Sequence, residues 1–294
     1  MQDIQPSFHP SPSKPRLRLP ALACDAHCHV FGPHRSFPFA QERTFTPADA
    51  PKETLFALHA MLGIERCVVV QSSCHGFNND VVADVIAAKP GTYCGVALLP
   101  VSVAEDELRR LDALGFRGVR FNFMRHLGKA APIQDVIAFG SRLAKLGWHL
   151  QIHFDSALIA ELAPWLKRSP VPVMIDHMGR MNAALGIDQP AFRLLLGLMQ
   201  DERFWVKVSG SERIARCPAP YDDAIPFARK LVAEFGDRTV WGTDWPHPNS
   251  AGGVPDDGVL VDLLSRIAPS EALRQPLLVD NPRRFYRFPA DAAD

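Results

Sequence analysis

The stretch CDAHCHVFGP, residues 24–33, places two histidines one residue apart in a short apolar run. In a β-strand, residues i and i+2 face the same side, so His27 and His29 would point at one spot. Two imidazoles at one spot offer two nitrogen ligands or two hydrogen-bond donors. The stretch therefore predicts a strand that ends at a functional site.

The chain around this stretch has the composition of an ordinary globular protein. It has 294 residues, of which 47% are hydrophobic and 22% charged, and its formal net charge is zero. A neutral chain has no global field that attracts nucleic acid or an anionic membrane. No apolar run reaches the roughly 18 residues of a membrane span, and the N-terminus lacks a secretory signal pattern. The six cysteines are thinly spread, so we expect reduced thiols and a cytoplasmic protein.

Short apolar runs rich in β-branched residues alternate with longer amphipathic stretches from residue 24 onward. Such alternation is typical of strand–helix units. Strands are predicted at 24–31, 66–73, 93–100, 117–123, 149–154, 172–179, 204–210 and 239–245. Helices are predicted at 52–62, 79–89, 104–114, 133–146, 157–168, 190–200, 222–235 and 256–267.

Eight strand–helix units in a chain of this length predict an α/β protein with a single (β/α)8 TIM barrel. The strands lack polar alternation, as expected when both faces are buried. A doubly wound sheet is the alternative, but the sequence has no glycine-rich phosphate loop after an early strand. We expect the barrel to span residues 21–294. Residues 1–20, rich in proline, serine and basic residues, are expected to form a disordered or surface-draped arm.

Polar residues interrupt the apolar runs at the carboxyl-terminal ends of most predicted strands, where TIM barrels carry their functional groups. A water-filled mouth tolerates such groups, whereas a packed core does not. The candidates at these positions are His27, His29, Ser73, Arg120, His153, His177, Arg180, Arg213, Asp244 and Asn249. Guanidinium groups match carboxylate or sulfonate oxygens. Three arginines at one mouth of a neutral protein therefore predict a dianionic ligand.

The order of these residues resembles that of a known enzyme family. An HxH pair on the first strand, histidines on the fifth and sixth, and an aspartate on the eighth resemble the amidohydrolase superfamily. The segments DAHCHVFGP, QSSCHG, GVRFNF, IDHMGR, WGTDWPHPN, PDDG and NPRRFY, in this order from about residue 24 to 286, resemble its bacterial 2-pyrone-4,6-dicarboxylate lactonase and 4-sulfomuconolactone hydrolase group. The resemblance implies a hydrolase that opens a lactone in aromatic-acid catabolism.

The resemblance also implies roles for individual residues. Asp244 would deprotonate the attacking water, while His27, His29 and His177 would polarise the lactone carbonyl and stabilise the oxyanion. Ser73 and Asn249 match positions that hydrogen-bond the substrate. The anionic groups of the substrate would meet Arg120, Arg180 and Arg213, with Arg125 as a further candidate. His247, in the same turn as Asp244, is expected to shape that turn.

Three positions depart from the dicarboxylate lactonase pattern. Phe45 and His153 stand where that pattern has tyrosines, and His126 stands near the place of an arginine. Metal-dependent amidohydrolases keep a ligand at the position of His153. Together with His27, His29 and Asp244 it would form a ligand set that suits catalytic zinc.

Several functions remain open at this point. We favour a zinc-assisted hydrolase of a 4-sulfomuconolactone-like substrate, because that sulfonated lactone suits the arginines and its hydrolases are zinc enzymes. The main alternative is a 2-pyrone-4,6-dicarboxylate lactonase without metal. A zinc decarboxylase of the same superfamily and a non-catalytic anion-binding barrel are further alternatives. The expected partner is a small anionic lactone, with neither nucleic acid nor membrane, and the sequence does not give the oligomeric state.

Overall fold

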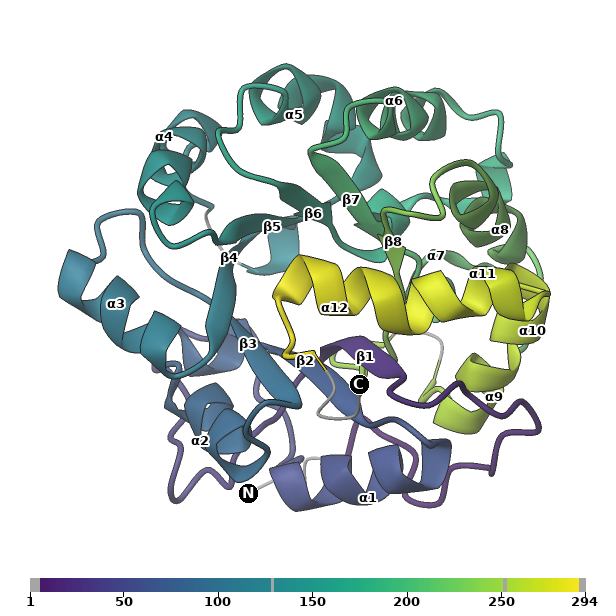
Figure 1. Cartoon of the computed structure of the whole chain (residues 1–294), viewed down its shortest axis with the longest axis horizontal. Helices are drawn as coiled ribbons and strands as arrows, with labels where there is room; N and C mark the ends of the chain where they lie inside the picture. Colours follow the sequence, from purple (N-terminus) through teal and green to yellow (C-terminus); the bar gives the residue numbers. More distant parts are fainter. Residues whose placement is uncertain (1–5, 128–129, 251–252, 291–294) are drawn as a thin grey trace.

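The structure of the chain is a computed structural model that describes residues 6–127, 130–250 and 253–290, apart from the side chain of Arg125. Its centre is one sheet of eight parallel strands that neighbour each other in sequence order (Figure 1). The strands are β1 (Cys24–Cys28), β2 (Arg66–Val70), β3 (Tyr93–Ala97), β4 (Phe116–Phe123), β5 (His149–Phe154), β6 (Val173–Ile175), β7 (Phe204–Lys207) and β8 (Thr239–Val240). The predicted eight strands are thus all present.

The segment after the short strand β8 closes the sheet into a barrel. The backbone N–H of Ala26 donates to the carbonyl of Trp241 (2.8 Å), and that of His29 donates to the carbonyl of Trp245 (2.7 Å). Gly242 permits this approach, because a Cβ at that position would lie 2.4 Å from the backbone nitrogen of His27. The predicted (β/α)8 barrel is therefore confirmed.

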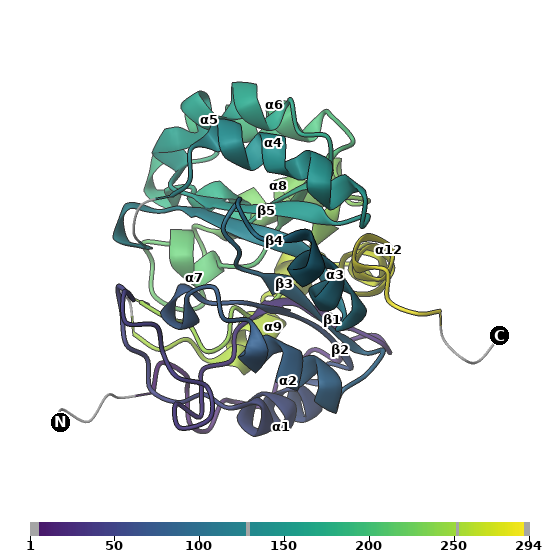
Figure 2. The ribbon, with the colours of Figure 1, turned by 90° about the vertical axis from the view of Figure 1, so that its left-hand side faces the viewer.

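Helices accompany the strands; most of them surround the barrel on its outer side, and others lie at its ends (Figures 1 and 2). They are α1 (Lys52–Leu62), α2 (Asp80–Ala88), α3 (Glu105–Ala113), α4 (Ile133–Ala144), α5 (Ile159–Leu166), α6 (Pro190–Met199), α7 (Ser211–Ile214), α8 (Ile225–Glu234), α9 (Asp257–Asp262), α10 (Leu264–Ile267), α11 (Glu271–Gln275) and α12 (Asn281–Tyr286). The helix predicted at 256–267 is split into α9 and α10, and α7, α11 and α12 were not predicted. Within the described residues, each helix is too short or too polar to cross a membrane.

Two hydrophobic clusters follow from the alternation of side chains along the strands. On β2, Val68 and Val70 belong to an inner cluster, whereas Cys67 and Val69 pack outward with the helices. Tyr286, at the end of α12, joins the inner cluster and is fully buried. Figures 1 and 2 show α12 across one end of the barrel and α7 at the other end. The open mouth thus lies on the side of α7.

The described part of the N-terminal segment, from residue 6 onward, lies over the barrel. The backbone and side chain of Ser13 hydrogen-bond the carboxylate of Asp256, which caps α9. The backbone N–H of Leu17 donates to Asp262 (2.9 Å). The ring of Phe8 lies 5.2 Å, between centroids, from that of Trp245, next to Asp244. These contacts give the segment a surface-draped course.

Candidate active site

A cavity opens at the carboxyl-terminal ends of the strands. Its wall is largely polar, and it is lined by His29, Phe45, Ser72, Ser73, Arg120, His126, Leu127, His153, His177, Arg180, Arg213, Asp244, Pro248 and Asn249. Nearly all of the predicted site residues therefore meet here. His27 lies beneath this wall and is fully buried. Arg125 begins the short helix η2 (Arg125–Leu127), and its side chain lies outside the described residues.

Asp244 is the centre of the site. Its Oδ1 lies 3.7 Å from Nε2 of His27, 3.5 Å from Nε2 of His29 and 3.7 Å from Nε2 of His177. Its Oδ2 accepts a hydrogen bond of 2.6 Å from Nε of Arg213. One carboxylate is thus held by an arginine on one side and faces three imidazole nitrogens on the other.

A tight turn after β8 positions Asp244. The residue adopts a left-handed backbone with φ of 63°, and its N–H donates to the carbonyl of His27 (2.7 Å). The N–H of His247 donates back to the carbonyl of Asp244 (2.8 Å), and the buried His247 ring donates from Nε2 to Asp257 (3.0 Å). Arg213 also donates to the carbonyl of Pro248 (2.7 Å). His247 therefore anchors the turn, as the sequence predicts.

The electrostatics of the site favour an ionised aspartate among neutral histidines. Burial would raise the pKa of Asp244, but Arg213 and then His177 outweigh it and hold the pKa well below its usual value. Burial, followed by the nearby ammonium of Lys207, lowers the pKa of His27 to about 3. Burial also lowers the pKa of His177 well below its usual value. Near neutral pH the site therefore combines a carboxylate with uncharged rings at His27 and His177.

The partners of the Nδ1 atoms orient the histidine rings. Nδ1 of His29 donates to the carbonyl of Val70 (2.7 Å), so in the neutral ring Nε2 is an acceptor. Nδ1 of His153 lies 3.1 Å from the amide oxygen of Asn122 and donates to it, which leaves a buried Nε2 with no partner. Nδ1 of His177 hydrogen-bonds the hydroxyl of Ser209 (3.1 Å). Each of these rings is held through Nδ1 by a group of the barrel, and its Nε2 lies on the opposite side of the ring.

The three predicted arginines differ in their partners. Nε of Arg120 donates to Asp176 (2.8 Å), and Nε of Arg213 donates to Asp244. Arg180 has neither an ion pair nor a hydrogen bond with any described residue, although it lines the cavity. Burial and the neighbouring Arg213 lower the pKa of Arg180 to about 10, so it stays cationic at neutral pH. Among the described side chains of this wall, Arg180 is therefore free to meet an anionic group of a ligand.

A charged group lies in the floor below the histidines. Lys207, at the end of β7, is fully buried and contacts the backbone of Ala26, the ring of His27 and the side chain of Gln151. Burial, opposed by Asp176, lowers the pKa of Lys207 to about 8, so the ammonium form predominates near pH 7. Lys207 was not predicted as a site residue. A lysine inside the apolar run FWVKVSG was the signal that could have found it.

Comparison with known proteins shows the family of the chain. The model of the family described as Amidohydrolase matches residues 24–288, which is most of the barrel.

The chain belongs to the amidohydrolase family.

Two curated relatives of this amidohydrolase are named as lactone hydrolases. The 2-pyrone-4,6-dicarboxylate hydrolase of Comamonas testosteroni is 46% identical over 288 residues, covering 95% of this chain and 94% of the relative. The 4-sulfomuconolactone hydrolase of Hydrogenophaga intermedia is 37% identical over 289 residues, covering 96% of this chain and 94% of the relative. A crystal structure of a probable 2-pyrone-4,6-dicarboxylic acid hydrolase from Acinetobacter baumannii, with citric acid bound, has a TM-score of 0.80 at 25% identity, covering 91% of this chain and all of the other.

Among its described residues, the amidohydrolase brings together two groups of potential metal ligands. His27, His177 and Asp244 each place a ligand atom within 4.8 Å of the other two, whereas the predicted ligands His29 and His153 lie outside this group. The ring centroid of His153 is 5.6 Å from that of His177. The candidate ligand set in the structure thus differs from the predicted set of His27, His29, His153 and Asp244.

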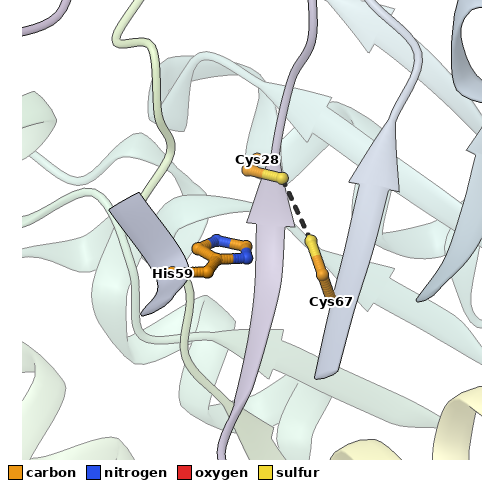
Figure 3. A group of neighbouring side chains, drawn as sticks. All are labelled: Cys28, His59 and Cys67. Carbon is orange, nitrogen blue, oxygen red and sulfur yellow. Dashed lines mark hydrogen bonds between the residues drawn. The ribbon is translucent and has the colours of Figure 1, made fainter. Parts of the chain in front are cut away.

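The second group lies outside the barrel, where Cys28 and Cys67 face His59 of α1 (Figure 3). The two thiols hydrogen-bond each other, with 3.2 Å between the sulfurs. Nε2 of His59 donates to Asp25 (3.2 Å), so its Nδ1 accepts from the hydroxyl of Tyr93 (2.6 Å). Because every ligand atom of the three residues already has a partner, we interpret this group as a hydrogen-bonded part of the packing between α1 and the barrel.

Proposed function

We propose that this amidohydrolase opens the ring of a lactone that carries two anionic groups, by attack of water on the lactone carbonyl. One observation carries the proposal: three imidazole Nε2 atoms lie within 3.7 Å of Oδ1 of the ionised, nearly buried Asp244. The cavity beside them is also lined by Arg180, which has no partner among the described residues. Ester hydrolysis needs a base for the water and donors for the oxyanion, and this arrangement supplies both.

The reaction would proceed by direct attack of water. Asp244 Oδ1 accepts a proton from the water while the oxygen of the water adds to the carbonyl carbon. In its neutral form, His29 presents the Nε2 lone pair beside Asp244, and the two acceptors together orient the two hydrogens of the water. His27 and His177 face the carbonyl oxygen and stabilise its developing negative charge. Collapse of the tetrahedral intermediate breaks the ring C–O bond, and the proton on Asp244 passes to the leaving oxygen.

The anionic groups of the substrate would contact the arginines. Arg180 lacks a carboxylate partner among the described residues and is the first candidate. Arg120 also lines the cavity. With the described residues it hydrogen-bonds only through Nε, to Asp176, which leaves its terminal nitrogens for a second anionic group. Ser73 and Asn249 line the same wall and would add hydrogen bonds. The Acinetobacter baumannii structure contains bound citric acid, and this supports an anionic ligand for the present protein.

A zinc ion is the cofactor that the sequence resemblance predicts, and the side chains of His27, His177 and Asp244 are of the right type to hold it. A histidine that binds metal normally donates its other ring N–H to an acceptor. Nδ1 of His27 instead hydrogen-bonds the ammonium of Lys207, which has no acceptor to offer. The residues present therefore do not fit a zinc ion in this arrangement, and no step above uses one. Zinc stays a prediction, which metal analysis of the purified protein tests.

Two lactones are the candidate substrates. Phe45 and His153 line the cavity at positions where the dicarboxylate lactonase pattern has tyrosines, and this favours 4-sulfomuconolactone or a similar sulfonated lactone. The 46% identity with the Comamonas testosteroni enzyme favours 2-pyrone-4,6-dicarboxylate as the second candidate.

Turnover in oxygen-18 water tests the reaction class. Hydrolysis incorporates one labelled oxygen into the new carboxylate, and Asp244→Asn should lower kcat by on the order of a thousandfold. Release of carbon dioxide without incorporation of the label would instead establish a decarboxylase. The exposed variant Asp237→Asn serves as the matched control and should keep the full rate.

A further inference from the structure

Lys207 lies below the catalytic histidines and has three hydrogen-bond partners. Its Nζ lies 2.9 Å from the carbonyl oxygen of Ala26, 3.0 Å from Oε1 of Gln151 and 3.2 Å from Nδ1 of His27. The side chain is fully buried, so water does not compete for these contacts. An ammonium group has three donors and no acceptor. The three donors therefore match three partners.

The number of ammonium donors determines whether Nδ1 of His27 donates or accepts a hydrogen bond. Two of the partners, the carbonyl of Ala26 and Oε1 of Gln151, are oxygens that accept. If Nδ1 of His27 carried a proton, its N–H would face the third ammonium N–H, which is repulsive. Nδ1 therefore accepts, and the proton of the neutral ring lies on Nε2, the nitrogen that is 3.7 Å from Asp244.

A competing partner for Nδ1 is Asp176. Its Oδ1 lies 3.3 Å from Nδ1 of His27 and 3.6 Å from Nζ of Lys207, which are ion-pair contacts without the alignment of a hydrogen bond. The other oxygen, Oδ2, is occupied by Arg120 (2.8 Å) and Gln151 (3.1 Å). Without the ammonium of Lys207, Nδ1–H would donate to Asp176, and Nε2 would become a lone pair. The two tautomers of His27 are thus selected by two neighbouring side chains.

We infer that Lys207 is a positioning residue that keeps the ring proton of His27 on Nε2. In this tautomer His27 directs an N–H into the site, as a donor for the oxyanion must. The same proton blocks the nitrogen that would bind a metal. Lys207 would therefore favour lactone hydrolysis by the protein's own side chains and oppose metal binding at His27. The effect on rate rests on the proposed function, whereas the tautomer and the metal affinity do not.

Nitrogen-15 NMR of the wild-type protein, labelled at its histidines and kept free of metal, tests the tautomer directly. A His27→Gln sample assigns the signals of His27. We expect the Nδ1 resonance at the shift of an unprotonated ring nitrogen and the Nε2 resonance at that of a protonated one. His59 is an internal reference of the same tautomer, because its Nε2 donates to Asp25. Protonated Nδ1 on His27 would overturn the inference without any variant having to fold.

The variant Lys207→Met separates this role from a merely structural one, because its two effects have opposite signs. The tautomer should switch to Nδ1–H, and zinc, measured by competition with a chelator, should bind about tenfold or more tightly. At the same time, kcat for lactone hydrolysis without metal should fall by roughly a hundredfold, as expected for loss of an oxyanion donor.

The surface variant Lys230→Met is the matched control and should change neither quantity. An unchanged tautomer and unchanged zinc affinity in a folded Lys207→Met protein would contradict the inference. If the wild-type protein opens neither lactone, the proposed function fails, while the NMR and zinc measurements still decide the role of Lys207.

Discussion

Arg213 binds the carboxylate of Asp244, with 2.6 Å between its Nε and Oδ2. The sequence predicts Arg213 as a substrate ligand. In the structure its guanidinium group donates this hydrogen bond and another to the carbonyl of Pro248, so both partners belong to the protein. Its side chain is also 3.3 Å from the buried Glu212. Arg213 thus has two buried carboxylates as neighbours, and its main effect is on the orientation and ionisation of Asp244.

Replacing Arg213 by glutamine should therefore lower kcat more than it raises KM. Asp244 would lose the cation that most strongly opposes the effect of burial on its pKa. We expect kcat to fall by about 10- to 100-fold and the acid limb of the pH–rate profile to move to higher pH. Steady-state kinetics across the pH range measure both effects. Arg203→Gln, which breaks an exposed pair with Asp201, is the control. A change in KM alone would show that Arg213 is a substrate ligand.

Arg180 should behave in the opposite way. Arg180→Gln removes a cation that has no partner among the described residues. The variant should therefore bind the anionic substrate more weakly. A charged hydrogen bond contributes about 1.5–3 kcal/mol, which corresponds to a rise in KM of roughly 10- to 100-fold. Thermal unfolding should change little, because no recorded ion pair is lost. An unchanged KM for both candidate lactones would exclude Arg180 from the anion site.

Phe45 and His153 should control the choice between the two lactones. The double variant Phe45→Tyr with His153→Tyr introduces two hydroxyl donors into the cavity wall. The ratio of kcat/KM for 2-pyrone-4,6-dicarboxylate to that for 4-sulfomuconolactone should rise by about tenfold or more, because each new hydrogen bond contributes about 1 kcal/mol. The ratio is measured on both proteins under identical conditions. A ratio that stays constant would show that these positions do not set specificity.

The sequence predicts the barrel well because its apolar runs are long and regularly spaced. It is less accurate at the carboxyl ends of the strands. The runs predicted at 172–179 and 239–245 include β6 and β8, but the backbone leaves the sheet after Ile175 and Val240. His177 and Asp244 then adopt left-handed conformations that bring them into the cavity. An apolar run does not distinguish such a turn from a continuing strand.

Long-range pairing explains what else the sequence did not show. Three arginines near one mouth predict three ligands for anions, but the sequence does not reveal that Asp176 and Asp244 neutralise two of them. Lys207 was missed for the same reason, since its partners come from β1 and β5. Helix α12 was missed because it follows the eighth strand–helix unit, where the barrel pattern predicts nothing further.

The stability of the fold should fall as the pH falls from about 6.5 to about 3. The pKa of His27 and that of His149 are each lowered to about 3, chiefly by burial. In this pH range the two histidines bind protons in the unfolded chain but not in the folded chain. Each histidine therefore lowers the free energy of unfolding by up to about 1.4 kcal/mol for each unit by which the pH falls. Carboxylates with a lowered pKa, such as Asp176, lose their contribution to stability only below about pH 4.

Urea unfolding at pH 7 and at pH 5 measures this dependence. His149→Gln removes one of the two proton sites, away from the cavity, and should make the loss of stability between these pH values smaller. Equal free energies of unfolding at pH 7 and pH 5 in the wild-type protein would contradict the neutral, buried histidines described above.

The most direct test of the account is the rate at which the purified protein opens 4-sulfomuconolactone and 2-pyrone-4,6-dicarboxylate, measured side by side with Asp244→Asn as the inactive reference. We expect ring opening that depends on Asp244, with the sulfonated lactone preferred. A preference for the pyrone would identify the second candidate substrate. Failure to open either lactone, with the protein folded and the cavity residues intact, would contradict the proposed function.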